Sequence, residues 1–235
     1  MSDVVWSAAM ISPVDDLCGA PVLRTTIALD RDDVASAVLH ASALGVFEAS
    51  VDGVPVSDDV LSPGWSSYEW RLRYRTCDVS SMVRDGALLS FALGNGWYRG
   101  RLGWAGKHAL YGDRLGVIAQ LEVTYADGSR QVVVSDETWT ASPSVTMAND
   151  LYDGQTIDAG RDRSAVVPVE VLPFDTAVLA PYVGPPVRRH ESVPPVRTWM
   201  SPSGRHLVDF GQNLVGWVRL RAHGPAGAVV TVRHA

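Results

Sequence analysis

Short runs of alternating apolar and polar residues recur through the first 135 residues, and they constrain the fold more than any other feature of this chain. A period of two places every second side chain on the same face of a β-strand. Turn signals such as Asp52-Gly53 and Asp127-Gly128 separate the runs. The expected strands span residues 23–29, 35–41, 46–51, 71–77, 88–93, 115–125 and 130–135. Many short strands with such punctuation predict an all-β antiparallel sandwich or barrel, from about residue 24 to residue 180.

Two local features refine this prediction. The segment QLEVTYADGSRQVVVS contains two alternating runs that meet at Asp127-Gly128, a pair suited to positive φ, and it predicts a β-hairpin. Residues 78–84 could form a helical turn, because Asp78 or Ser80 could cap a short amphipathic segment there. No other helix is expected in the chain.

The stretch LSPGWSSYEWRLRYRTCDV combines aromatic residues, alternate arginines and one cysteine. It raises three possibilities: a catalytic cleft, a basic nucleic-acid patch, or a loop that leads into a strand. Alternation favours the strand, with one apolar face and a row of solvated cations on the other. The apolar face would carry Leu72, Tyr74 and Thr76, and the cations would be Arg71, Arg73 and Arg75.

Composition limits the function classes. The 235 residues are 46% hydrophobic and 20% charged, enough for one large or two small domains with a sizeable core. The net charge of −6 argues against a nucleic-acid partner. No signal peptide and no run of eighteen apolar residues are present, so we expect no membrane contact and favour a cytoplasmic location. Cys18 and Cys77 are too few for a disulfide scaffold, and we expect both to be buried as small hydrophobes.

Prolines gather between Val166 and Val196, and they mark a domain boundary because proline cannot donate to a β-ladder. We therefore predict a first domain over residues 1–185, a Pro-rich linker over 186–196 and the start of a second β domain over 197–235. Strands are expected near residues 217–222 and 228–232. The pattern stops there, so we expect the second domain to be truncated.

The loop GNGWYRGRLGW, residues 94–104, is the first candidate site. Its glycines indicate unusual φ values or a close backbone approach. In one interpretation its aromatic residues wedge the loop onto the sandwich. In the other they stack on the apolar face of a pyranose while polar side chains bind its hydroxyls. The candidate sugar-binding residues here are Asn95, Trp97, Tyr98, Arg99 and Trp104.

The acidic segment MANDLYDGQTIDAGRD, residues 147–162, is the second candidate site. Asn149, Asp150 and Asp153 supply hard oxygen ligands of the kind that calcium prefers, although the spacing is not that of an EF-hand. Asp150 and Tyr152 could also contact sugar. The alternative is a loop of solvated carboxylates. No HxH, HExxH or GxSxG motif is present, so neither a zinc site nor an acyl-transfer nucleophile is expected.

Four ordered motifs carry a family resemblance. They are ALGVFEASVDGVPVSDDVLSPGWSSYEWRLRYRTCDVSSMV, LGNGWYRGRLGW, DLYDGQTIDA and DFGQNLVGWVRLR. Together they closely resemble the N-terminal region of bacterial α-L-rhamnosidases of glycoside hydrolase family 78, from about Trp6 to the end of the chain. The resemblance implies a jelly-roll-like β-sandwich, related in places to rhamnose-binding modules that use calcium. It also implies that the DFGQN segment opens a further β domain.

The resemblance implies that the active site of such an enzyme lies on a later (α/α)6 barrel. Its acid and base belong to a motif of the DGCPWRE type, which no stretch of this sequence matches. We therefore expect a non-catalytic segment of an inverting rhamnosidase, with a rhamnose-containing carbohydrate and the missing catalytic barrel as its partners and no required cofactor. Two hypotheses stay open: the sandwich binds sugar, or it is a structural module that buttresses the barrel. Hydrolysis by this chain itself is a third and less favoured hypothesis.

Overall fold

The computed structural model describes residues 4–234, and almost all of its regular structure is β. The chain divides into two compact units, one ending at Arg189 and the other beginning at His190. This division falls inside the segment expected to be a linker. The limits 1–185 and 197–235 of the two expected domains stay predictions.

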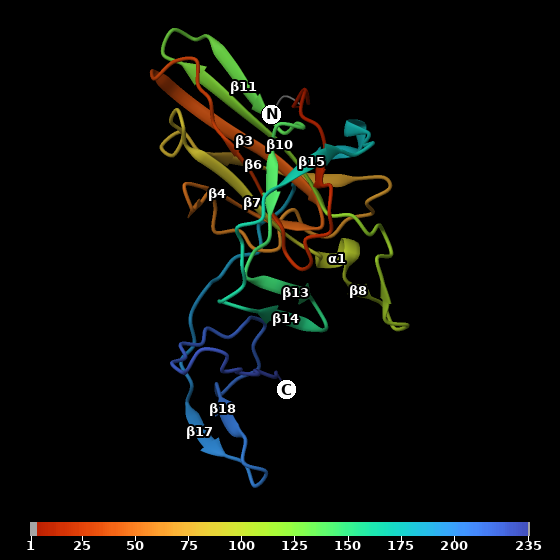
Figure 1. Cartoon of the computed structure of the whole chain (residues 1–235), viewed down its shortest axis with the longest axis vertical. Helices are drawn as coiled ribbons and strands as arrows, with labels where there is room; N and C mark the ends of the chain where they lie inside the picture. The colour runs from red at the N-terminus through yellow and green to blue at the C-terminus, as the bar shows by residue number, and fades with distance from the viewer. Residues whose placement is uncertain (1–3, 235) are drawn as a thin grey trace. The chain divides into compact units, whose positions relative to one another are not determined.

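Most strands of the first unit form one curled, mostly antiparallel sheet whose two halves face each other across the core (Figure 1). The first layer runs in the order β6-β3-β10-β1, with β11 also paired to β10. Its strands are β1 (Ile11–Pro13), β3 (Val34–Leu44), β6 (Leu72–Asp78), β10 (Gly116–Tyr125) and β11 (Arg130–Val134). The second layer runs in the order β12-β2-β7-β4-β5. Its strands are β2 (Val22–Thr26), β4 (Val46–Val51), β5 (Val54–Pro55), β7 (Leu88–Gly94) and β12 (Thr140–Ser142).

Short elements join and extend these layers. β15 (Val167–Val171) pairs with β1 and with β12 and so connects the two layers, while β16 (Leu179–Pro181) pairs with β6 in parallel. Two small hairpins, β8–β9 (Arg101–Leu102 and Lys107–His108) and β13–β14 (Thr146–Asp150 and Gly154–Ile157), lie outside the main sheet. The helical segments in the described part of the chain are α1 (Gly96–Arg99) and the 3-10 turn η1 (Thr176–Val178).

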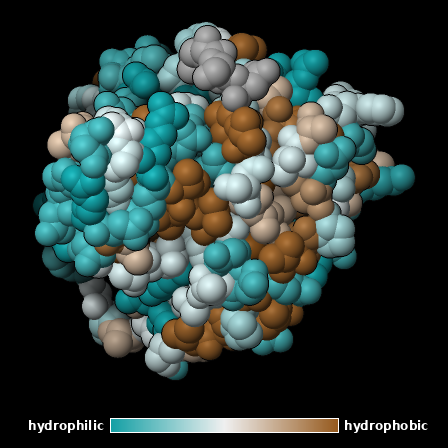
Figure 2. Space-filling model, turned by 90° about the horizontal axis from the view of Figure 1, so that it is seen from above, coloured by the Kyte–Doolittle hydropathy of each residue, from teal (hydrophilic) through white to brown (hydrophobic). Residues whose placement is uncertain are grey.

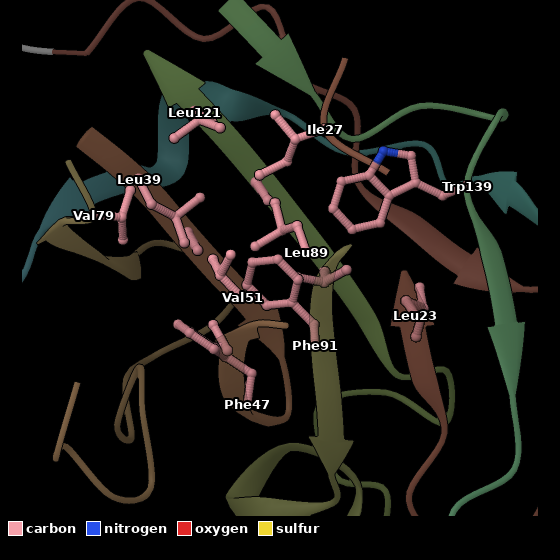
Figure 3. Packing of buried hydrophobic residues seen from close by; sticks show 14 of the residues in the cluster. Leu23, Ile27, Leu39, Phe47, Val51, Val79, Leu89, Phe91, Leu121 and Trp139 are labelled. Carbon is pink, nitrogen blue, oxygen red and sulfur yellow. The ribbon is translucent and has the colours of Figure 1, made fainter. Parts of the chain in front are cut away.

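The main core lies between the layers, because each strand buries one of its two faces. In β7 the buried residues are Leu89, Phe91 and Leu93, and their neighbours are only partly buried. Phe91 contacts Phe47 and Trp139 at ring-centroid distances of 5.7 and 5.9 Å (Figure 3). Burial of such side chains contributes about 1.5–3 kcal/mol each.

A second, smaller core lies on the outer face of the first layer. Ile118 points away from its neighbours Val117 and Ala119, which belong to the main core. Tyr68 and Tyr98 pack in the same cluster as Ile118. These tyrosines come from the loops before β6 and after β7, so the second core fixes both loops against the sheet.

Figure 2 shows one face of the molecule, on which hydrophobic residues form separate patches among hydrophilic ones. Within the described residues, no helix is long and apolar enough to cross a bilayer. Neither observation tests the expected cytoplasmic location.

The prediction of an all-β antiparallel sandwich is confirmed, and the expected strands match β2, β3, β4, β6, β7, β10 and β11 closely. The β10–β11 hairpin closes at Asp127-Gly128 as predicted, with Gly128 at φ +84°. The jelly-roll-like connection stays a prediction. The helical turn expected at residues 78–84 is a single turn and not a longer helix: the Val83 amide donates to the Val79 carbonyl, the Ser80 amide donates to Oδ1 of Asp78, and Gly86 follows at φ +76°.

The expected row of solvated arginines is only partly correct: Arg71 is exposed, but the returning chain partly covers Arg73 and Arg75 on this face of β6. The guanidinium of Arg73 donates to the carbonyl of Pro181 at 2.9 Å. Arg75 is ion-paired with the buried carboxylate of Asp59 and lies over the ring of Tyr182. Cysteine burial was likewise overestimated: Cys18 is exposed in a turn at φ +50°, while Cys77 is half-buried.

The second unit has regular structure only in the hairpin of β17 (Arg197–Met200) and β18 (His206–Asp209), as far as the described residues show. The strands expected near residues 217–222 and 228–232 do not form. Their residues are exposed, and no neighbouring strand pairs with their backbone. A strand needs such a partner to satisfy its amides and carbonyls.

Candidate functional site

A groove of about 320 Å³ lies where the loop after β7 meets the β13–β14 hairpin. It contains five of the predicted site residues: Asn95, Arg99, Asn149, Asp150 and Asp153. The two candidate segments, about fifty residues apart in sequence, therefore form a single site. The groove is also lined by Met147, Ala148, Gly154, Gln155 and Thr156 of the second segment, and by Gly19 and His108, which lie outside both candidate segments.

Two asparagines join the segments. The Asn95 amide donates to Oδ1 of Asn149, and Nδ2 of Asn95 donates to the Asn149 carbonyl, both at 2.6 Å. Nε of Arg99 in turn donates to Oδ1 of Asn95 at 2.7 Å. Nη2 of Arg99 donates to the Gly19 carbonyl at 3.3 Å, so this arginine is held at the groove wall by two contacts. Burial lowers the pKa of Arg99, and nearby carboxylates oppose that effect.

Asp150 organises the turn of the hairpin. Its Oδ1 accepts the amides of Tyr152 at 2.8 Å and Asp153 at 3.1 Å, while its Oδ2 accepts the amide of Arg101 at 2.6 Å. Burial raises the pKa of Asp150, but the three backbone amides outweigh this and leave it below the ordinary value. Asp153 forms an ion pair of 3.2 Å with Nε of Arg101. The carboxylate of Asp150 is therefore a structural anion, and that of Asp153 lies at the open edge.

The three predicted calcium ligands are already engaged by N–H groups. Oδ1 of Asn149, both oxygens of Asp150 and Oδ1 of Asp153 each face a donor. Within the part of the chain that the structure describes, no cluster of three or more His, Cys, Asp or Glu side chains is placed to hold a metal. A cation at this position would have to displace these N–H donors from the oxygens. Calcium at Asn149, Asp150 and Asp153 stays a prediction.

The predicted aromatic residues do not form the groove. Tyr98 is buried in the second core, where its ring lies 5.1 Å from that of Tyr68. Trp97 stacks on Trp65 with ring planes 4° apart and centroids 6.2 Å apart. Trp104 is fully exposed in the β8–β9 turn, and Tyr152 lies under the guanidinium of Arg101 at 5.3 Å.

Alternate side-chain directions in α1 explain this separation. Asn95 and Arg99 are four residues apart and face the groove together, as positions one helical turn apart do. The side chain of Trp97 packs on Trp65 instead, and that of Tyr98 packs on Tyr68 in the second core. Since no helix was expected here, the sequence pattern could not sort these neighbours. His108 was missed because only the β8–β9 pairing brings it beside residues 149–155.

The fold and groove define this chain as a β-sandwich module with a polar recess at one loop end. Comparison with known proteins identifies the family. Residues 32–191 match the α-L-rhamnosidase N-terminal domain, and residues 200–235 match the bacterial α-L-rhamnosidase concanavalin-like domain. The chain therefore belongs to the α-L-rhamnosidase N-terminal domain family.

Relatives support this membership along nearly the whole chain. An α-L-rhamnosidase of Streptomyces avermitilis is 39% identical over 98% of this chain and 24% of its own length. The native Aspergillus terreus α-L-rhamnosidase structure has 35% identity and a TM-score of 0.83, covering 90% of this chain and 26% of that one. The structure of the Streptomyces avermitilis α-L-rhamnosidase complexed with L-rhamnose has 34% identity and a TM-score of 0.77, covering 88% of this chain and 20% of that one. This chain thus spans about a quarter of the length of the curated relatives that match more than 90% of it.

Proposed function

We propose that this chain is a non-catalytic carbohydrate-recognition segment of an α-L-rhamnosidase, an enzyme that removes terminal α-L-rhamnose from glycans or glycosides. The convergence of the two candidate segments on one groove is the observation that carries the proposal. The family membership and a relative in complex with L-rhamnose support the choice of sugar.

The groove offers the groups that a small sugar needs. Its volume of about 320 Å³ lies within the range of small-ligand sites, about 300–1,000 Å³. Asp153 and Gln155 can accept hydrogen bonds from sugar hydroxyls, while Arg99 and His108 can donate to them. Met147 supplies apolar contact for the sugar ring. Each net hydrogen bond contributes about 1 kcal/mol, so a few of them with one apolar contact give about 4 kcal/mol. That free energy corresponds to a dissociation constant of about 1 mM.

Titration of L-rhamnose into the 235-residue chain tests the proposal. We expect millimolar binding, detected on the sugar by saturation-transfer NMR. In spectra of the protein, we expect chemical-shift changes only at amides near residues 95–99 and 149–155. Asp153→Ala should weaken binding about tenfold, because it removes an exposed acceptor without disturbing the core. Asp32→Ala is the matched control, since Asp32 is exposed in a different loop.

The same titration with a chelator and then with added calcium tests whether the metal contributes. Loss of binding on chelation would support calcium at Asn149, Asp150 and Asp153. No binding at tens of millimolar rhamnose, with calcium present, would defeat the proposed sugar site.

The second candidate function is a structural module that buttresses the catalytic barrel. One observation favours it: Trp104 and Trp70, two large apolar side chains, are exposed by 108% and 82% in this chain. Aromatic residues are enriched at protein–protein interfaces relative to the rest of the surface. If rhamnose does not bind, the barrel of the same enzyme is the expected partner of these surfaces.

A further inference from the structure

A second recess lies outside the groove, beside the start of β6. Its volume is about 400 Å³, and its lining residues are Trp65, Ser66, Ser67, Trp70, Arg71 and Arg73. These residues belong to the stretch GWSSYEWRLRYR. No residue of the rhamnose groove lines this recess, so the two sites have separate walls.

Two tryptophans give the recess an aromatic character. Trp97 supports one face of Trp65, and Nε1 of Trp65 donates to the hydroxyl of Tyr111 at 3.3 Å. This held indole is nevertheless 55% exposed. Trp70 is 82% exposed and has no ring partner among the described residues. Exposed indole faces of this kind stack on the C–H face of a pyranose.

Two arginines give the recess a positive charge that the protein does not neutralise. Among residues 4–234, no carboxylate forms an ion pair with Arg71 or Arg73. Arg73 donates one of its five N–H groups to the carbonyl of Pro181, and the side chain of Arg71 is exposed. Glu69, the acidic residue of this loop, is exposed and directly precedes Trp70 in the sequence. It forms no ion pair among the described residues. Free guanidinium groups bind carboxylates in a bidentate manner.

The backbone of this loop is organised before any ligand binds. The amides of Trp70 and Arg71 both donate to the Ser67 carbonyl at 2.8 Å, and the Ser66 hydroxyl donates to the Arg71 carbonyl at 2.7 Å. Between these contacts Tyr68 is anchored in the second core, 4.8 Å from the ring of Tyr111. A fixed loop loses little entropy when it binds a ligand.

We propose that this recess binds an acidic sugar, a uronate, through stacking on Trp65 and Trp70 and through a carboxylate bridge to Arg71 and Arg73. A neutral sugar would use the tryptophans but leave the arginines without an anion. A small inorganic anion would use the arginines but leave the tryptophans bare. A sugar that carries a carboxylate uses both. The subsite is independent of rhamnose binding in the groove, and it would let this segment recognise acidic polysaccharide chains.

Calorimetric titration of the 235-residue chain with trigalacturonate tests the proposal, with galactotriose as the neutral counterpart and sodium acetate as the carboxylate without a sugar. At about 150 mM salt we expect trigalacturonate to bind about tenfold more tightly than galactotriose, and acetate not to bind measurably. The indole N–H signals of Trp65 and Trp70 should shift in NMR spectra.

Variants assign the two contributions. Arg71→Gln should weaken trigalacturonate about tenfold and leave galactotriose unchanged, since a charged hydrogen bond contributes about 1.5–3 kcal/mol. Trp70→Ala should weaken both saccharides. Arg130→Gln, at an exposed arginine on β11, is the matched control and should change neither. Both test side chains are exposed, so thermal unfolding should show that these variants fold.

Three results would overturn the proposal. Equal affinity for trigalacturonate and galactotriose would show that Arg71 and Arg73 do not bind a carboxylate. Binding that survives Arg71→Gln and Trp70→Ala would place the site elsewhere. No binding of either saccharide would leave this surface for a protein contact. Asp153→Ala distinguishes these failures from failure of the rhamnose groove, because it changes the groove alone.

Discussion

Individual polar side chains hold the candidate groove together. Asn95 and Asn149 exchange backbone and side-chain hydrogen bonds across two segments, and Asp150 binds three backbone amides. The groove therefore depends on these short hydrogen bonds. Their loss would loosen the β13–β14 hairpin without changing the packing of the core. Asp150 is a positioning residue in this arrangement, and Asp153 is available to a ligand.

Asp150→Ala should release the β13–β14 turn. The substitution removes the acceptor of three amides, and we expect a local loss of about 1–2 kcal/mol, the range for a lost turn or cap acceptor. Hydrogen exchange at the amides of Arg101, Tyr152 and Asp153 measures it directly. Asp153→Ala is the control, because it removes an ion pair and no amide contact. Unchanged protection in Asp150→Ala would contradict the role assigned to this carboxylate.

Asp127 gives the β10–β11 turn a dependence on pH. The hydroxyl and amide of Ser129, followed by Arg31, lower the pKa of Asp127 well below the ordinary value of 3.8. A lowered folded-state pKa means that the stabilising contribution is present above about pH 4 and is lost as the pH falls through the folded value. NMR titration of the carboxyl carbon should give a midpoint well below 3.8, and Ser129→Ala should raise it. A midpoint at the ordinary value would contradict these contacts.

The connection between β3 and β4 decides how the two layers are joined. β3 belongs to the first layer and β4 to the second, and Gly45 alone separates them. Gly45 has φ +121°, and a Cβ there would lie 2.4 Å from the Gly94 carbonyl oxygen. Only glycine tolerates both the conformation and the contact.

Gly45→Ala should therefore destabilise the sandwich by more than about 2 kcal/mol, because strained φ and a backbone clash add. Chemical denaturation measures the loss. Gly53→Ala is the matched control: φ is +78° there, but a Cβ would meet no atom within 4 Å, so we expect about 1 kcal/mol. Equal losses at the two glycines would contradict the clash with Gly94.

Both hydrophobic cores belong to the first unit, and no buried residue occurs among residues 190–234. The first unit thus contains the packing that folding requires. Arg188 closes it through ion pairs with Asp58 and Asp59 at 3.0 and 3.2 Å.

A chain ending at Arg189 should therefore fold by itself, with a midpoint of thermal unfolding within about 2 °C of the 235-residue chain. A chain ending at Leu179 is the contrasting variant. It removes most of β16, Tyr182 and Arg188, so it exposes Arg75 and Asp59 and should unfold at least 5 °C lower. Equal midpoints for these two chains would show that the returning segment does not stabilise the unit.

The sequence alone determined the seven expected strands of the first unit, because a period of two and Asp-Gly turns are local signals. Val46 to Val51 and the turn at Asp127-Gly128 needed no tertiary information. It also marked the two segments that form the groove, since glycines and aromatic residues cluster in the first and aspartates in the second.

Only the tertiary structure decided which neighbours share a surface. The turn of α1 directs Asn95 and Arg99 to the groove, Trp97 to Trp65 and Tyr98 to the core, and composition cannot separate such adjacent residues. The parallel pairing of β16 with β6 brought a returning segment that partly covers Arg73 and Arg75 and leaves Arg71 solvated as expected. That contact joins residues about a hundred positions apart, so no pattern within β6 could reveal it.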